Sequence, residues 1–206
     1  MLAAFIASFL LIAVSELGDK TFFIAAILAM RHSRRLVFAG AVSALAAMTI
    51  LSVLVGQVAA LLPKTYIQYA EIALFLGFGF KLLYEASKMP ASSCDTEIIQ
   101  EAKTAVDKAE LDLPKTKNAG AIIAEAFTLT FLSEWGDRTQ IATIALATRY
   151  PVVGVTIGAI LGHALCAALA VMCGRMLAGR ISERKLTIAG GILFIIFGVM
   201  AVVEAA

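Results

Sequence analysis

Residues 15–21 read SELGDKT and residues 133–139 read SEWGDRT, so one charged motif occurs twice, 118 positions apart. Each copy lies near the centre of an apolar run, the first over residues 2–30 and the second over residues 119–148. A charged side chain at the centre of a membrane helix costs about 2.5–3.5 kcal/mol on insertion scales and faces a partner or a water-filled cavity. The two copies therefore indicate a functional site inside a membrane protein.

The match between the two halves of the chain continues beyond the motif. At the same shift Gly40 aligns with Gly158, and a shift of 119 aligns Glu85 with Glu204. The chain is thus expected to contain two repeats of three helices each. Because three is an odd number, the second repeat enters the membrane from the opposite side, and a pseudo-two-fold axis in the membrane plane relates the halves. This arrangement is typical of secondary transporters.

The composition also indicates a membrane protein, with 61% hydrophobic and 16% charged residues and a mean hydropathy of +0.91. A helix needs about 20 residues to cross the hydrocarbon, and four further apolar runs are long enough: 36–62, 66–88, 150–174 and 186–203. Their continuous rather than alternating pattern excludes strands. We expect an all-α polytopic membrane protein with six transmembrane helices as two inverted-topology repeats. The net charge of +2 is too balanced to suggest nucleic acid as a partner.

One sizeable polar segment, residues 89–118, separates the two halves and is bracketed by Pro90 and Pro114. We expect three parts: a first three-helix repeat over residues 1–88, this linker, and a second repeat over residues 119–206. A short amphipathic helix is predicted in the linker, which is either a solvated connection or a regulatory element. Its apolar positions at helical spacing are Ile98, Ala102, Ala105, Ala109 and Leu113.

The basic residues of the loops predict the orientation of the chain. One set of alternate loops holds only Lys64 and Arg149, whereas the other set holds twelve lysines and arginines. Cytoplasmic loops carry the excess of basic residues, so we expect both termini outside the cytoplasm and the linker inside. The twelve residues are Arg31, Arg34, Arg35, Lys88, Lys103, Lys108, Lys115, Lys117, Arg175, Arg180, Arg184 and Lys185.

Four motif carboxylates are expected to form one metal site at the membrane midplane. On a continuous helix Glu16 and Asp19 are about 60° apart with ~4.5 Å of rise, so both point to one face. The inverted repeat places Glu134 and Asp137 opposite them. Neighbouring hydroxyls and an amide complete the shell: Ser15, Thr21, Ser133, Thr139 and Gln140.

The donor set of this site predicts the ion. All donors are oxygens, which suits Ca²⁺ or Mn²⁺, while Mg²⁺ dehydrates reluctantly and the absence of His and Cys from the motif disfavours Zn²⁺ or copper. Four carboxylates crowded in a low-dielectric site cannot all stay ionised, so a cation must displace protons. We expect no cofactor, a divalent cation as the transported substrate, and H⁺ as the coupling ion.

The motif also contains basic residues and glycines. Lys20 and Arg138 each follow the motif glutamate by four positions, so each either pairs with and releases that carboxylate during transport or only stabilises the empty site. Gly18 and Gly136 either let the motif helices approach closely or let the backbone unwind to offer a carbonyl. A buried ion-pair cluster that only fixes helix packing is the alternative for the whole motif.

Other polar residues in the apolar runs are weaker candidates. His163 aligns with Leu45 of the first repeat, so we expect a hydrogen-bonded packing residue rather than a proton relay. Glu125 is a candidate for lining an access path. Lys81 and Glu85 are expected to form an i,i+4 pair that packs or reaches the membrane surface.

The twin motif, Glu16–Thr21 and Glu134–Thr139, resembles that of the Gdt family of Mn²⁺/Ca²⁺ transporters over nearly the whole chain. The resemblance implies cation–proton antiport, with Glu16, Asp19, Glu134 and Asp137 at the family's acidic positions. It further implies a bacterial manganese exporter of the MneA kind in the inner (cell) membrane. Alternating access is expected to come from rocking one repeat against the other.

Three readings compete with Mn²⁺ export. A Ca²⁺/H⁺ antiporter of the same family would use the same carboxylates. An intramembrane lipid-phosphate enzyme would need more phosphate-binding residues than Arg138, and an amino-acid exporter would have less use for four acids. We therefore expect a transporter and not an enzyme. The sequence leaves the oligomeric state open, with a homodimer as one arrangement.

Overall fold

The computed structural model describes residues 1–89, 96–111, 118–177 and 182–205, and every regular element within these ranges is an α-helix. Four of the helices are long and apolar enough to cross a membrane. Their bounds differ by a few residues from the predicted runs, because polar residues near the membrane surface continue the helical turns. These helices are α3 (Arg34–Ala59), α4 (Lys64–Lys88), α8 (Val152–Leu177) and α9 (Glu183–Ala205).

The two motif-bearing runs are not continuous helices. The first is divided into α1 (Leu2–Glu16) and α2 (Lys20–Arg31), which are bent by 67° and count together as one broken span or a re-entrant loop. The second is divided into α6 (Ala119–Ser133), a shorter apolar helix, and α7 (Arg138–Arg149). By length and composition the described helices therefore supply four spans, or five with the bent pair. The all-helical class is confirmed, and six spans are not established.

Glycine explains both breaks. Gly18 has φ +78° and Gly136 has φ +82°, and no other described residue has a positive φ. Glycine adopts this left-handed region without the steric cost that a Cβ brings. The prediction of helix geometry through each motif is therefore wrong, and the alternative in which the backbone unwinds at Gly18 and Gly136 is the one observed.

Helices from the two halves pack in pairs: α1 against α8, α3 against α6, and α4 against α9. Glycines lie at the contacts of all three pairs, and in two pairs they lie directly against a backbone carbonyl of the partner helix. A Cβ added at Gly40 of α3 would lie 2.6 Å from the carbonyl oxygen of Ile123, and one at Gly158 of α8 would lie 2.5 Å from that of Phe5. The backbones thus approach closely, as is common between membrane helices.

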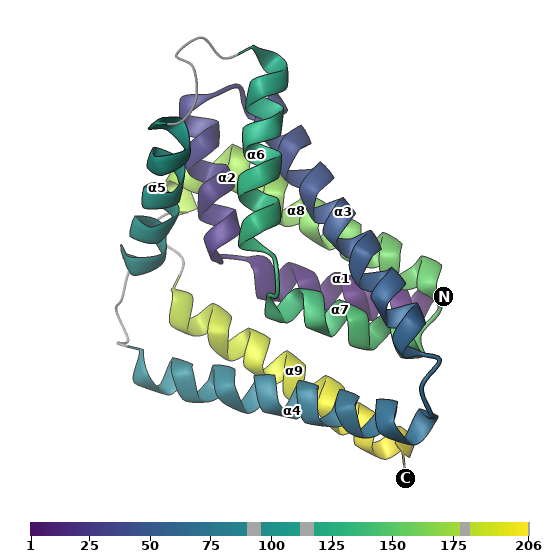
Figure 1. Ribbon diagram of the computed structural model, residues 1–206. Coiled ribbons are helices and arrows are strands. Elements are labelled where there is room, and N and C mark those ends of the chain that lie inside the picture. Colours follow the sequence, from purple (N-terminus) through teal and green to yellow (C-terminus); the bar gives the residue numbers. More distant parts are fainter. Residues whose placement is uncertain (90–95, 112–117, 178–181, 206) are drawn as a thin grey trace.

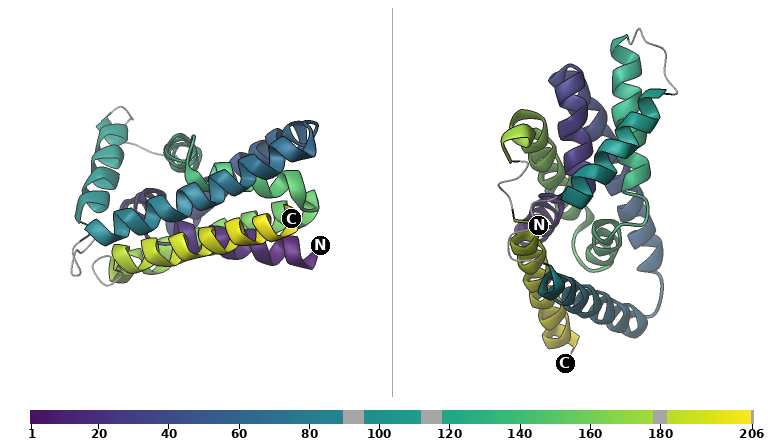
Figure 2. Two further views of the ribbon diagram at one scale, coloured as in Figure 1. Left: turned by 90° about the horizontal axis from the view of Figure 1, so that it is seen from below. Right: turned by 90° about the vertical axis from the view of Figure 1, so that its left-hand side faces the viewer.

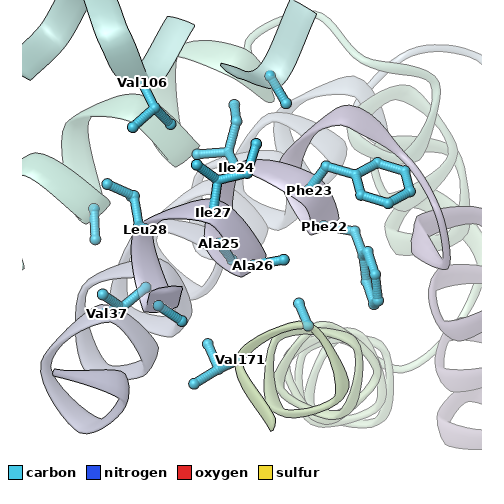
Figure 3. Close-up of a cluster of buried hydrophobic side chains, with 14 residues drawn as sticks. Phe22, Phe23, Ile24, Ala25, Ala26, Ile27, Leu28, Val37, Val106 and Val171 are labelled. Carbon is cyan, nitrogen blue, oxygen red and sulfur yellow. The ribbon is translucent and has the colours of Figure 1, made fainter. Parts of the chain in front are cut away.

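The predicted linker helix is present as α5 (Thr96–Leu111), whereas Pro90, Leu113 and Pro114 lie outside the described residues. It packs on α2, and Ala102 and Val106 are fully buried there. Figure 3 shows Val106 pointing toward α2, with Val171 of α8 on the other side of that helix. The linker helix is therefore part of the folded core.

The long helices place the chain ends away from α5. In Figures 1 and 2 the N- and C-termini lie at one end of the molecule, and α5 lies at the opposite end. The breaks between α1 and α2 and between α6 and α7 lie between these ends, where the two motifs meet in the middle of the structure (Figure 1).

Candidate cation site

Each break turns a motif aspartate into a helix cap. Asp19 precedes α2, and its carboxylate accepts a 2.7 Å hydrogen bond from the backbone N–H of Lys20. Asp137 precedes α7, and its Oδ2 accepts from the backbone N–H (3.1 Å) and the hydroxyl (3.0 Å) of Thr139. Aspartate is favoured at this position because the first N–H groups of a helix lack partners and carry partial positive charge.

The structure brings three of the four predicted carboxylates together. One carboxylate oxygen from each of Glu16, Asp19 and Asp137 lies within 4.8 Å of the other two. Oxygens that bind a Ca²⁺-sized ion at 2.3–2.6 Å are separated by about 5 Å at most. Residues of both motifs therefore supply donors at distances that suit one divalent cation.

The fourth carboxylate, Glu134, lies beside this group. It is the charged residue that acts most strongly on Glu16. The hydroxyl of Thr21 donates to Glu16 at 3.4 Å and also acts on Glu134, so it lies between the two glutamates. Within the described residues Glu134 is not one of the three carboxylates of the 4.8 Å group. It is a neighbour of that group.

The two glutamates are much less exposed than the aspartates. Glu16 and Glu134 are 3% and 4% exposed, whereas the Asp19 side chain is 25% exposed. Thr21 Oγ1 donates to Glu16 Oε2 at 3.4 Å, and in the described part of the chain Glu16 Oε1 has no hydrogen-bond partner. A buried carboxylate oxygen without a partner is costly. A cation or a proton would satisfy it.

The basic motif residues do not pair as predicted. An Arg138 Nη2 donates to Asp19 Oδ2 at 3.2 Å and to the carbonyl oxygen of Ser15 at 3.3 Å, so it reaches the other motif. The Lys20 ammonium lies 3.3 Å from Glu101 of α5. Pairing at i,i+4 requires a continuous helix, and the breaks remove that spacing. In this conformation neither base therefore pairs with its own motif glutamate, and pairing in another conformation stays a prediction.

The remaining motif residues have mixed surroundings. Gln140 Oε1 accepts a 2.7 Å hydrogen bond from Gly136 N–H, so this amide holds the break in place. The Ser15 hydroxyl is buried and has no partner among the described residues. Ser133 ends α6 and is half-buried, and Gly18 is buried in the first break. Of these, Ser15 remains the best candidate for completing the shell.

A cavity of about 110 Å³ adjoins the carboxylates on the side of α5. Its lining includes Ser15, Asp19 and Arg138, together with Glu85 of α4 and Ile98 of α5. The predicted pair of Lys81 and Glu85 is confirmed at 3.8 Å. Sequence reasoning missed the position of Glu85 on this cavity, since an i,i+4 pair on a helix surface does not report what the helix packs against.

Glu125 and Glu71, two acidic residues of the apolar runs, have partners elsewhere. His32 Nε2 lies 3.8 Å from Glu125, and Arg149 bonds Glu71 and also contacts Glu204. His163 is 5% exposed, and no hydrogen bond of its Nδ1 is found in the described ranges. The expectation of a hydrogen-bonded packing residue at His163 is therefore not met.

Known proteins resemble the chain over its full length. A family model for the "Divalent cation/proton antiporter GDT1" matches residues 4–90 and 122–206. The chain is 56% identical over 201 residues to the GDT1-like protein sll0615 of Synechocystis, which covers 98% of this chain and 97% of that protein. It is 44% identical over 204 residues to the GDT1-like protein 3 of Arabidopsis thaliana, with 95% and 69% covered.

A second Arabidopsis thaliana relative, the GDT1-like protein 5, is 40% identical over 218 residues and covers 98% of this chain and 96% of its own. No solved structure matches the chain. These matches confirm the family that the twin motif indicated. The protein is a transporter and not an enzyme, and it belongs to the GDT1 family of divalent cation/proton antiporters.

Proposed function

We propose that this protein exports Mn²⁺ from the cytoplasm in exchange for protons, with Glu16, Asp19, Glu134 and Asp137 as the metal ligands. The observation that carries the proposal is the 4.8 Å cluster of Glu16, Asp19 and Asp137, which draws on both motifs. Its oxygens suit a hard or borderline divalent cation. Glu134 acts electrostatically on Glu16, and we assign it as the fourth ligand on that ground.

Proton exchange follows from the same geometry. Carboxylates crowded in a mostly buried site cannot all be ionised in the absence of metal, so protons occupy part of the site. A divalent cation replaces them, since metal ligands must be deprotonated. Arg138 holds Asp19 in the meantime and must release it when the cation enters.

We further propose that residues 1–88 and 119–206 are inverted repeats joined by the linker over residues 89–118. Equivalent contacts support this arrangement. Gly40 meets Ile123 and Gly158 meets Phe5, which are the same pair of positions at a shift of 118. Gly79 meets Ile195 and Gly198 meets Leu76, which are equivalent at a shift of 119. A two-fold relation produces such reciprocal pairs.

The proposed location is the bacterial cell membrane, with both termini outside and the linker in the cytoplasm. The common end of the two termini, opposite α5 (Figure 2), supports placing the termini on one side of the membrane and the linker helix on the other. The basic residues near α5 agree with it, because cytoplasmic loops carry the positive excess. In this orientation Met89 and Ile98, which line the cavity that Asp19 also lines, lie on the cytoplasmic side, from which an exporter takes up its cation.

Flux measurements in proteoliposomes test the shared site. Glu16→Gln and Glu134→Gln should each abolish Mn²⁺ uptake driven by a proton gradient, because one cation needs ligands from both motifs. The matched control is Asp107→Asn, which removes an exposed carboxylate paired with Arg31 and should keep wild-type flux. Activity near one half in each single glutamine variant, at normal protein levels, would show two independent sites and refute the proposal.

A further inference from the structure

Two small cavities lie beside the carboxylate cluster, one against each motif glutamate. The Glu16 cavity is lined by Glu16, Thr21, Thr130 and His163, among other residues, and has a volume of about 10 Å³. The Glu134 cavity is lined by Glu134, Thr139, Thr143 and His163, among others, and has a similar volume. A volume of this size holds about one water molecule or one ion.

The two cavities occupy equivalent places in the two repeats. Adding 118 to Glu16, Thr21 and Leu45 of the first cavity leads to Glu134, Thr139 and His163 of the second. Leu45 and His163 line both cavities, so these two equivalent side chains lie between them. The imidazole therefore shares one cavity with each motif glutamate.

The chemistry of the cavities is unequal although their positions are equivalent. His163 stands where the first repeat has Leu45, and Thr130 stands where it has Ile12. Both polar residues line the Glu16 cavity. The second repeat thus adds a nitrogen and an oxygen donor to the glutamate of the first.

Three buried polar atoms around the Glu16 cavity lack partners. Within the described part of the chain, Glu16 Oε1, Thr130 Oγ1 and His163 Nδ1 make no hydrogen bond, and their residues are 3%, 1% and 5% exposed. Cys166 of the same cavity is satisfied, since its thiol donates to the Ala13 carbonyl at 3.5 Å. Buried polar groups are almost always paired, so three unpaired donors and acceptors around one ion-sized space indicate an occupant.

The hydroxyls of the Glu134 cavity contrast with these atoms. Thr143 donates to the Thr139 carbonyl at 2.8 Å, Thr49 to that of Leu45 at 2.9 Å, and Ser52 to that of Met48 at 2.8 Å. Each of these hydroxyls therefore already donates its hydrogen to a backbone carbonyl oxygen. The Glu16 cavity is therefore the better site for a ligand.

We propose that the Glu16 cavity is an inner cation subsite, in which Glu16, Thr130 and His163 bind the transported ion and His163 favours Mn²⁺ over Ca²⁺. The proposal rests on the proposed function and adds a nitrogen ligand to it. Ca²⁺ takes oxygen ligands, whereas first-row transition ions also accept imidazole. Replacing one oxygen by nitrogen therefore penalises Ca²⁺ and leaves Mn²⁺ bound.

Pulsed EPR of Mn²⁺ bound to the detergent-purified protein tests this ligand directly. The wild type should show ¹⁴N modulation from a coordinated imidazole, and His163→Leu, which copies Leu45 of the first repeat, should lose it. Loss of an outer-sphere partner weakens metal binding roughly tenfold or more, so loss of a direct ligand in His163→Leu should raise the dissociation constant for Mn²⁺ by at least roughly tenfold. The dissociation constant for Ca²⁺ should change less than about threefold. His163→Gln, a polar variant without a ring nitrogen, should behave as His163→Leu does.

A second substitution separates the oxygen donor from the nitrogen. Thr130→Val, which keeps the shape of the side chain, should weaken Mn²⁺ and Ca²⁺ alike and retain the ¹⁴N signal. If Mn²⁺ binds to the wild type but shows no ¹⁴N modulation, the proposed subsite is wrong. The cavity would then hold an ordered water molecule instead of the cation. If His163→Gln weakens the binding of Mn²⁺ and Ca²⁺ equally, His163 is a packing residue and not a ligand. Absence of any Mn²⁺ binding to the wild type would refute the proposed function as well.

Discussion

Substitutions at Gly136 test whether the motif backbone is broken as described. An added Cβ at Gly136 has nothing within 4 Å, so Gly136→Ala introduces no clash. The whole cost is that of an L-residue at φ +82°, which is about 1–2 kcal/mol. Asparagine adopts this region more readily than other residues, so Gly136→Asn should cost less than Gly136→Ala. Gly77→Ala is the control, because its Cβ is also unobstructed and Gly77 lies inside α4.

Thermal denaturation in detergent measures these differences. For a chain of this size 1 kcal/mol corresponds to about 2–4 °C in Tm, so Gly136→Ala should lower Tm by about 2–8 °C. Gly77→Ala should leave Tm unchanged or raise it, because alanine is favoured over glycine in a helix by about 1 kcal/mol. If Gly136→Ala raises Tm as the control does, the helix runs through the motif and the reasoning about the break is wrong.

Three further predictions concern orientation, the linker helix and proton coupling. In intact cells a cysteine at Lys64 should react with a maleimide that does not cross membranes and one at Lys103 should not; the reverse pattern would invert the topology. Val106→Asp buries a charge against α2 and should undock α5, seen as faster amide hydrogen exchange over residues 96–111 with α4 and α9 unchanged; unchanged exchange in α5 would contradict the packing. Mn²⁺ affinity should rise with pH, because each bound cation displaces protons, and Asp19→Asn should reduce the number of protons released; affinity that is independent of pH from 5.5 to 8.5 would exclude proton exchange at these carboxylates.

The long helices were predictable because a segment that crosses the hydrocarbon must be apolar and must satisfy its own backbone hydrogen bonds. A run of about 20 apolar residues with no charge has one stable conformation in hydrocarbon, the helix. The run over residues 36–62 accordingly became α3 (Arg34–Ala59), and that over residues 186–203 became α9 (Glu183–Ala205). The breaks at Gly18 and Gly136 were not decided by hydropathy, since glycine is compatible with a packed helix as well as with a turn.

The acidic residues of the site were predictable, but their partners were not. Charge at the centre of an apolar run identifies Glu16 and Asp19 whatever the local backbone does. The contact of Arg138 with Asp19 joins residues 119 positions apart, and helical spacing cannot reveal it. The alignment of His163 with Leu45 at a shift of 118 favours a packing role, yet His163 lines the Glu16 cavity and brings a nitrogen to it.

The glycine contacts at Gly40 and Gly158 limit how the molecule can move. At these contacts α3 packs on α6, and α8 packs on α1, at backbone distance. The first helix of each half of the sequence, α1 or α6, therefore packs tightly on a long helix of the other half. Swinging one half as a block against the other would separate both contacts. The pair of α4 and α9 packs mainly within itself and is made of the last helix from each half. In an alternating-access cycle the α4–α9 pair would then move as one unit relative to the other helices. Both the moving unit and the part that stays fixed would contain helices from both halves of the sequence.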